Sequence, residues 1–223
     1  MIDLETVKNS NDWSSFKTID QYNNNEVDGF LCHHGGDDYG MLFITSVNGQ
    51  SALSVVTATP KLHYPFSKDG NWNFPKASKL LRFAKLDGTN LFVFSYTDSN
   101  KKQYFSCKTR LVPFLQNSKF GPFKDMLDDI IVGGFNPAKL VTDLDMNLSF
   151  ELCGNRNPHL IKYDIPLKMA LLFARKGNVI LPPTEINVDP NICAAYKGEI
   201  TKDYVATYQK IQNELNEKNK ELE

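Results

Sequence analysis

The segment FAKLDGTNLFVF, residues 83–94, places Lys85, Asp87 and Gly88 inside an otherwise apolar run. A lysine amine can attack a phosphorus centre only after losing its proton, and its ordinary pKa of about 10.4 prevents that at neutral pH. Burial beside other cations or a metal ion lowers such a pKa and frees the nucleophile. Asp87 projects to the same side of an extended chain and can orient the amine or the water shell of a metal. Gly88 allows close approach to a ligand, although an Asp-Gly pair is also typical of a simple hairpin turn.

A second segment strengthens the case for phosphoryl chemistry. SFELCGNRNPHLIKYDIPLKMALLFAR, residues 149–175, places Glu151 on a predicted strand and ends a later strand at Arg175. Three motifs in this order, KLDGTN, FELCGNRNPHLIKY and LKMALLFAR, resemble ATP-dependent RNA ligases of the bacteriophage type. These ligases belong to the covalent nucleotidyltransferase superfamily, and the similarity covers about residues 74–176.

The resemblance implies a reaction and its participants. Lys85 would attack the α-phosphate of ATP, form lysyl-AMP and release pyrophosphate, with Mg²⁺ as the metal cofactor. The AMP would pass to a 5′-phosphate RNA end, which is then sealed to a 3′-hydroxyl end. Phosphoryl transfer depends mainly on positioning and charge neutralisation, which a basic region and a metal ion supply.

The resemblance also implies a set of nucleotide-binding residues: Lys85, Asp87, Gly88, Asn90, Arg110, Glu151 and Phe173. Asn90 would hold the nucleotide or an RNA phosphate, and Arg110 the ribose or a phosphate. Glu151 would bind the ribose hydroxyl or a metal-bound water, so that Asp87 and Glu151 would hold the metal through water. Phe173 would lie against the adenine. Arg110 as a surface salt-bridge partner and Phe173 as plain core are the simpler alternatives.

Two other kinds of function fit part of this pattern. A DNA ligase or a capping guanylyltransferase shares the lysine motif, but Thr89-Asn90 and the NPHLIKY run favour an RNA ligase. A non-catalytic nucleic-acid-binding protein would use basic charge alone. Residues 61–124 contain twelve Lys and Arg against three acids, whereas the whole chain has a formal net charge of −1. Such a protein would bind RNA with strong salt dependence and ignore ATP.

The sequence around these motifs predicts an antiparallel α+β fold. Hairpins are expected at Asn48-Gly49, between residues 91–96 and 103–112, and within 168–182. Helices are expected within 121–135 and over the charged C-terminal segment, whereas residues 1–28 promise only a short helix and a loop. We therefore expect an antiparallel-sheet, ATP-grasp-like nucleotidyltransferase core with peripheral helices. Residues 1–60 would be a hairpin-containing extension, and residues 61–223 the adenylyltransferase domain.

The sequence also departs from the ligase pattern. A later E-G-x-V strand and a final K-x-K strand are not found, and KGEI, residues 197–200, has the wrong order and is interpreted as a loop before the last helix. The chain is then either cut before those strands or a natural short relative, and we expect nucleotidyl transfer by these 223 residues alone to be weak or absent. No secretory signal, membrane span or C-x-x-C pair is found, which indicates a cytoplasmic protein.

Overall fold

The structure is a computed structural model that describes residues 3–34, 36–61, 63–74, 77–201 and 203–220. The chain forms two compact units. The first comprises Met1–Lys61 and Leu86–Ala194, and the second comprises Leu62–Lys85 and Ala195–Glu223. The sequence analysis divides the chain by function, into an extension (residues 1–60) and an adenylyltransferase domain (residues 61–223). That division stays a prediction.

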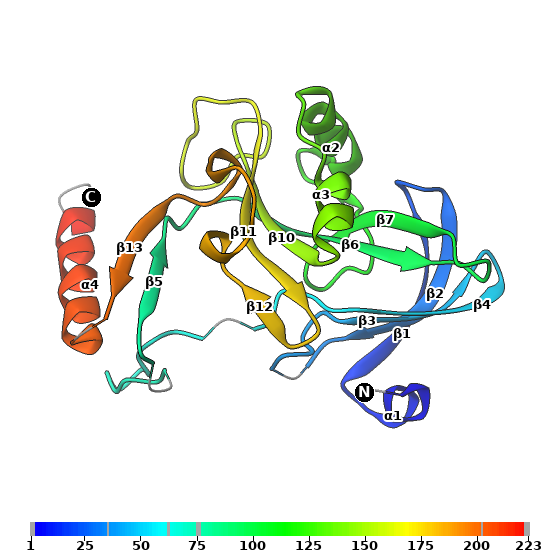
Figure 1. The fold of residues 1–223 in the computed structure, drawn as a ribbon, viewed down its shortest axis with the longest axis horizontal. Helices are drawn as coiled ribbons and strands as arrows, with labels where there is room; N and C mark the ends of the chain where they lie inside the picture. The colour runs from blue at the N-terminus through cyan, green and yellow to red at the C-terminus, as the bar shows by residue number, and fades with distance from the viewer. Residues whose placement is uncertain (1–2, 35, 62, 75–76, 202, 221–223) are drawn as a thin grey trace. The chain divides into compact units, whose positions relative to one another are not determined.

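A four-stranded antiparallel sheet opens the first unit after a short helix, α1 (Leu4–Asn9) (Figure 1). Its strands follow the chain order: β1 (Trp13–Asp20), β2 (Asn25–Cys32), β3 (Leu42–Val47) and β4 (Gln50–Val56). Asn48 and Gly49 turn β3 into β4 with φ angles of 52° and 74°, a conformation that both residue types tolerate. The predicted hairpin at this dipeptide is therefore confirmed.

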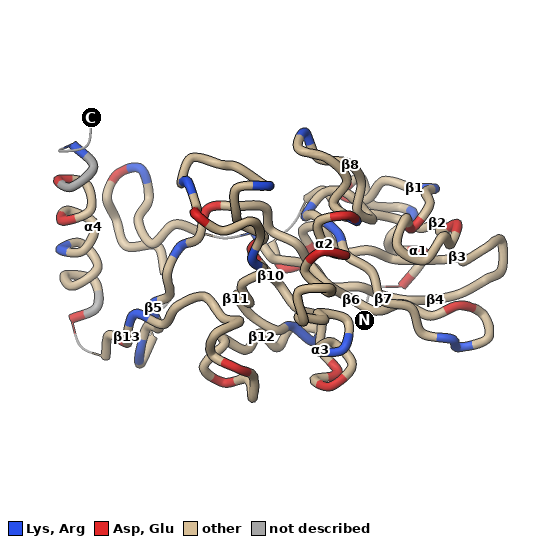
Figure 2. The backbone as a smooth tube through the Cα atoms, turned by 90° about the horizontal axis from the view of Figure 1, so that it is seen from above, with Lys and Arg blue, Asp and Glu red and all other residues tan. Residues whose placement is uncertain are grey.

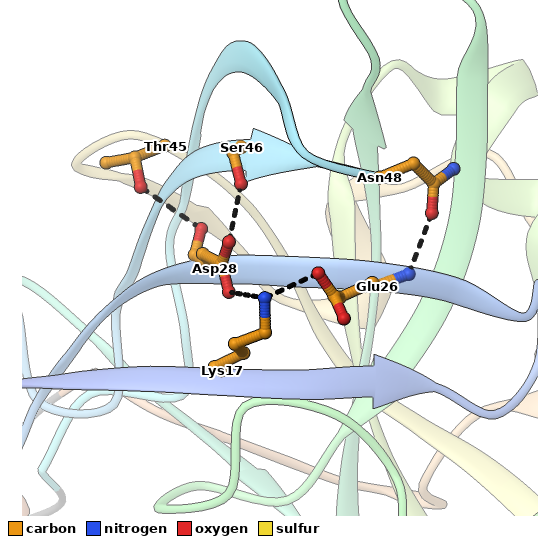
Figure 3. Close-up of polar contacts among 6 residues, drawn as sticks. All are labelled: Lys17, Glu26, Asp28, Thr45, Ser46 and Asn48. Atoms are coloured by element: carbon orange, nitrogen blue, oxygen red, sulfur yellow. Dashed lines mark hydrogen bonds and ion pairs between the residues drawn. The ribbon is translucent and has the colours of Figure 1, made fainter.

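Polar side chains hold three of these strands in register. The Lys17 ammonium lies 2.5 Å from a Glu26 carboxylate oxygen and 3.6 Å from one of Asp28, on the neighbouring strand (Figure 3). The Ser46 hydroxyl donates to the other Asp28 oxygen at 2.8 Å, and the Asn48 side-chain oxygen accepts from the Glu26 amide at 2.9 Å. A slip by one residue would separate these cross-strand partners, so the contacts favour the observed pairing.

A five-stranded antiparallel sheet forms the rest of the first unit, in the order β12-β11-β10-β6-β7. Its strands are β6 (Thr89–Thr97), β7 (Gln103–Lys108), β10 (Asn147–Cys153), β11 (Lys168–Lys176) and β12 (Val179–Leu181). Both predicted hairpins in this region are confirmed. Between β7 and β10 lie a short ribbon, β8 (Asn117–Ser118) and β9 (Gly121–Pro122), and the helices α2 (Phe123–Val132) and α3 (Pro137–Leu144). Short 3₁₀ helices follow β12: η1 (Pro183–Glu185) and η2 (Pro190–Ile192).

The apolar run LFVF at 91–94 is buried on both faces of this sheet, because β6 is covered on both sides. Leu91 and Val93 join a core with residues of α2, α3, β10 and β11, whereas Phe92 and Phe94 join a second core with residues of the four-stranded sheet. Side chains alternate between the two faces of a strand, so a strand with two covered faces is apolar throughout rather than at every second position.

A buried polar network links the two sheets. The Asp20 carboxylate, at the end of β1, accepts hydrogen bonds from Tyr96 Oη at 2.7 Å and Ser106 Oγ at 2.8 Å. Tyr96 Oη in turn accepts from the Asn25 amide at 2.9 Å. Burial, and then the nearby Asp20 charge, raises the pKa of Tyr96 above its usual range. The hydroxyl therefore stays protonated and keeps donating to Asp20.

The second unit is built on a two-stranded sheet of β5 (Leu80–Phe83) and β13 (Tyr196–Ile200), followed by α4 (Tyr204–Lys220). The interpretation of residues 197–200 as a loop is therefore wrong. Pairing with β5 stabilises this extended segment, and the Arg82 guanidinium donates to the Lys197 carbonyl at 2.9 Å. The rings of Phe66, Trp72 and Tyr208 pack together within the same unit.

The expected α+β nucleotidyltransferase core with peripheral helices is wrong. The structure is rich in strand, at 38%, with 21% helix, and its strands form several separate antiparallel sheets. The physical reason lies partly in residues 13–32, which pair as β1 and β2 although their sequence is mostly polar. Among the described residues, no helix is long and apolar enough to cross a lipid bilayer.

One of the twelve basic residues counted within 61–124 is not on the surface. Lys108 ends β7 fully buried, and its ammonium donates to the carbonyls of Gly40, Thr109 and Arg110 at 2.8–2.9 Å. Desolvation, with a smaller effect of the Arg110 charge, lowers the pKa of Lys108 from 10.5 to about 7. The three carbonyls satisfy all three N–H groups of the charged form, so Lys108 ties β7 to the segment that precedes β3.

This buried lysine makes stability depend on pH. The unfolded chain holds the Lys108 proton up to about pH 10.5 and the folded chain only up to about 7. The unfolded state therefore binds more protons in this range, and the free energy of unfolding gains up to about 1.4 kcal/mol per pH unit from Lys108. We expect urea unfolding at pH 7 and pH 9 to show this gain in the wild type and in Lys8→Met, whose lysine is exposed. Lys108→Met should lack it, and an equal pH response in all three proteins would contradict the prediction.

Candidate functional site

The two segments singled out in the sequence lie side by side in the structure. KLDGTN leads into β6, and FELC, residues 150–153, forms the end of β10, which pairs antiparallel with β6. In this register Asn90 faces Glu151 across the strands, and Thr89 faces Leu152. The sheet therefore brings together residues that are far apart in the sequence, as their proposed common role requires.

The loop before β6 is anchored through Asp87. Its carboxylate accepts a hydrogen bond from the Ile161 amide at 2.7 Å, and its own amide donates to Tyr163 Oη at 2.9 Å. Both partners belong to the long connection between β10 and β11. Asp87 thus fastens the KLDG segment to the loop that follows Glu151.

Gly88 and Thr89 continue this attachment. A Cβ atom on Gly88 would collide with the Leu152 carbonyl oxygen, so only glycine allows the two backbones to approach this closely. The buried Asn157 amide donates to the Leu152 carbonyl at 2.8 Å and to the Thr89 hydroxyl at 3.1 Å. Gly88, which the sequence predicts to allow close approach of a ligand, therefore allows close approach of β10.

Asn90 is held by protein groups on both sides of its amide. Its nitrogen donates to Ser149 Oγ at 2.9 Å and to the Phe150 carbonyl at 3.1 Å, and its oxygen accepts from Thr59 Oγ1 at 2.8 Å. These bonds connect β6, β10 and the segment after β4. The structure gives Asn90 a role in joining these elements, and its contact with a phosphate stays a prediction.

Glu151 and Phe173 share a face of the five-stranded sheet with Asn90. Glu151 pairs with Asn90 on one side and Ala170 on the other, while Phe173 pairs with Ser149. Paired residues point to the same face, and so do residues two apart along a strand. Glu151 is half-buried. Phe173 packs against the core between the two sheets, which fits its simpler interpretation.

Arg110 lies two residues beyond the end of β7 rather than on that strand. Its guanidinium stacks over the Tyr39 ring at 5.5 Å, and its Nε is buried without a hydrogen-bond partner. A cation over an aromatic face is a stabilising arrangement in its own right. The place expected for Arg110 at a nucleotide stays a prediction.

Lys85 is exposed and lies outside any strand. Residues 84–88 connect β5 to β6 without forming a strand, so Lys85 lies in a connecting segment. Lys85 is the last residue of the segment Leu62–Lys85 of the second unit, and the chain continues with Leu86 in the first unit. One residue, Leu86, separates Lys85 from the anchored Asp87, and these two steps of the chain span at most about 7 Å.

The acidic groups can be compared with what a metal ion needs. Within the described part of the chain, no group of three or more His, Cys, Asp and Glu side chains is placed to hold a metal. Mg²⁺ is commonly bound by one or two carboxylates, with waters and substrate phosphates completing its shell. The role expected of Asp87 and Glu151, contact with a metal ion through water, stays a prediction.

Tyr163 and Asn157 are the site residues that the sequence did not identify. Both stand in the segment that carries the resemblance, but nothing in their local pattern indicated that they reach Asp87, Leu152 and Thr89. His159 also approaches Thr89 Oγ1, at 3.3 Å. These contacts depend on the path of residues 154–167, which contain no helix or strand.

Removing the Tyr163 hydroxyl should loosen the loop before β6. Tyr163→Phe leaves the half-buried Asp87 amide without its acceptor, at a cost of about 1 kcal/mol. Because the Ile161 contact remains, we expect local opening rather than unfolding. Hydrogen exchange of the Asp87 amide, followed by NMR, should accelerate severalfold. Tyr64→Phe, at a side chain that is 83% exposed, is the matched control. Unchanged exchange at Asp87 would show that the Tyr163 contact contributes nothing.

Charge around this region is mixed rather than uniformly basic. Lys108 is buried, and both basic and acidic positions are scattered along the tube (Figure 2). Lys124, the last basic residue of this range, is half-buried and paired with Asp128. The surplus of basic residues within 61–124 is therefore only partly a surface property.

The chain was compared with known proteins. No protein-family model matches it, and no curated protein matches it.

Proposed function

We propose that this protein is the lysine-adenylylating part of an ATP-dependent RNA ligase. The observation that supports it is the mutual anchoring of the two motifs: Asp87 bonded to the 161–163 loop, and Asn90 paired with Glu151. The proposal relies on these contacts and on the motifs themselves, not on the overall fold.

The proposed reaction begins at Lys85. Its deprotonated amine forms a bond to the α-phosphorus of ATP, the bond from that phosphorus to the bridging oxygen breaks, and pyrophosphate leaves. The amine proton passes to solvent. Mg²⁺, when bound, would neutralise charge on the phosphates. Asp87, already held by Ile161 and Tyr163, would keep the adjoining lysine loop in one position, which supplies the orientation that such displacements need.

The later steps use RNA ends as substrates. An oxygen of a 5′-phosphate attacks the phosphorus of lysyl-AMP and releases Lys85. The product is an RNA whose 5′-phosphate carries AMP. A 3′-hydroxyl then attacks the 5′-phosphorus of that end, and AMP leaves as the phosphodiester forms. We further propose that this takes place in the cytoplasm.

The proposal is tested by covalent labelling. The 223-residue chain, and a longer chain that continues past Glu223, are incubated with Mg²⁺ and ATP labelled at the α-phosphate, at the γ-phosphate, or with α-labelled GTP. We expect α-label from ATP alone to remain on the protein after denaturation. The label should resist base and be released by mild acid, as a phosphorus–nitrogen bond requires.

Other labelling patterns would support a different function. Label from GTP would favour a capping guanylyltransferase, and label from γ-ATP would indicate phosphorylation instead. No label on either chain, together with salt-dependent RNA binding that ATP does not alter, would favour a non-catalytic nucleic-acid-binding protein.

A further inference from the structure

Lys168, at the start of β11, shares a face of the five-stranded sheet with Glu151. It pairs with Cys153, which lies two residues beyond Glu151 on β10, and paired residues point to the same side of a sheet. The next residue, Met169, belongs to the core shared with α2 and α3, on the opposite side. The Lys168 side chain is therefore carried on the Glu151 side of the sheet.

Two other basic side chains of this sheet, whose strands are all described, point to the same face, and both already have partners. Lys108 is fully buried, with its ammonium on three carbonyl oxygens. Arg175 is also buried, at 1% exposed, and its guanidinium donates to three carbonyl oxygens at 2.6–2.9 Å. Lys168 is exposed and forms no ion pair within the described part of the chain. Of these three cations, Lys168 is the one available to a ligand.

Lys168 also lies in the same row of the sheet as Gly88. Thr89 pairs with Leu152, and a Cβ on Gly88 would lie 3.1 Å from the Cys153 Cβ, so Gly88 lies beside Cys153. Cys153 in turn pairs with Lys168. Neighbouring strands are about 4.8 Å apart, which puts the two outer backbones of this row roughly 10 Å apart. The flexible four-carbon stem of lysine can cover much of that distance.

The Cys153 thiol responds to the charges on both sides of it. Burial, and then the Glu151 charge, raises the pKa of Cys153, whereas the Lys168 charge lowers it. The carboxylate and the ammonium group therefore act on one patch of the sheet. A cation at this position offsets the repulsion that the Glu151 carboxylate would exert on a bound phosphate.

The rows of this face offer three kinds of chemical group in a fixed order. Along β10 and β11 they present the Phe173 ring, then the Glu151 carboxylate, then the Lys168 ammonium group. An aromatic ring can stack on a base, a carboxylate accepts hydrogen bonds from hydroxyl groups, and an ammonium ion binds phosphate. This order matches base, ribose and phosphate. The phosphate end is also the Gly88 end, from which the chain leads back to Lys85.

We propose that Lys168 binds the phosphate chain of the nucleotide on the Glu151 face. The inference rests on the proposed function, because it concerns the same site. Lys168 stays protonated, forms no covalent bond, and donates hydrogen bonds to non-bridging phosphate oxygens. Its charge offsets part of the negative charge on the phosphates as pyrophosphate leaves.

Binding of unreactive nucleotides tests this proposal without adenylylation. AMP has no pyrophosphate to release and adenosine has no phosphate, so neither can label Lys85. Titrations of the 223-residue chain without Mg²⁺ are followed by NMR at the backbone amides of Gly88 and Ala170, which pairs with Glu151. For Lys168→Gln we expect AMP binding to be about tenfold weaker and adenosine binding to be unchanged. The difference in AMP binding should shrink as salt is added, because an exposed charge is screened.

Two further variants are controls for charge and position. Lys168→Arg keeps a cation at the same place and should bind AMP like the wild type. Lys176→Gln removes a charge from the same strand and should also bind AMP like the wild type, because Lys176 is adjacent to Arg175 and points to the opposite face. Thermal unfolding shows whether each variant is folded.

The outcomes separate this proposal from the proposed function. Equal AMP binding by the wild type and Lys168→Gln, a parallel loss of adenosine binding, or no AMP response in the wild type would each overturn the role of Lys168. A wild type that α-labelled ATP leaves unlabelled, with AMP binding that depends on Lys168, would reject adenylylation and keep the phosphate contact. A labelled wild type, with AMP binding unaltered in Lys168→Gln, would do the reverse.

Discussion

Lys85→Ala is expected to carry no AMP after incubation with ATP and Mg²⁺, under conditions in which the wild-type chain, or its longer form, is labelled. The loss should be complete, because alanine has no atom that can form the bond to phosphorus. The substitution removes an exposed side chain outside any strand, so the fold and its unfolding transition should not change. Intact mass spectrometry compares the two proteins, and peptide mapping places the adduct.

Two control variants test whether the loss of label is specific to the amine of Lys85. Lys85→Arg keeps the positive charge but removes an amine that can be deprotonated, and it should also remain unlabelled. Lys162→Ala removes another exposed lysine, from the loop that holds Asp87, and should be labelled like the wild type. Label that persists in Lys85→Ala at a different residue would reject Lys85 as the nucleophile.

Gly88→Ala should be the most disruptive single-methyl substitution in the candidate site. The added carbon collides with the Leu152 carbonyl oxygen, which is backbone and cannot move aside without displacing β10. We expect a loss of about 3 kcal/mol in the free energy of unfolding, as for other overpacked positions. Because β6 and β10 hold Asn90 opposite Glu151, any labelling of Lys85 should fall as well.

Urea unfolding measures this cost, and Gly36→Ala is the matched control. A Cβ on Gly36 meets no atom within 4 Å, so the same substitution there should change stability by only a few tenths of a kcal/mol. Equal free energies of unfolding for Gly88→Ala and Gly36→Ala would contradict the prediction. They would show that β6 and β10 can move apart at Gly88 without a loss of stability.

Local signals in the sequence predicted the elements that depend on them. Asn48-Gly49 turns a hairpin because both residues tolerate positive φ, and the spacing of Met126, Leu127 and Ile130 marks α2. The sequence assigned Asn90 and Glu151 to one site, and the pairing of β6 with β10 places them opposite each other. The hairpin and the helix were predictable because a short local pattern contains the necessary information.

The errors concern structure that depends on distant partners. β1 and β2 contain many polar residues on their outward face, where Lys17, Glu26 and Asp28 pair across strands, so their sequence looked like loop. The segment 197–200 becomes β13 only because β5 is available to pair with it. The contact between Tyr163 and Asp87 has the same origin, because it depends on the path of a loop without regular structure.

The pairing of β5 with β13 also sets a time order for synthesis. β5 ends at Phe83, and its partner does not begin until Tyr196. At translation rates of about 5–20 residues per second, the ribosome needs on the order of ten seconds to make the intervening chain. Until then β5 has an unpaired edge that is open to other strands or to chaperones. Among the described residues, the sheet of β5 and β13 is therefore the last sheet that can be completed during synthesis.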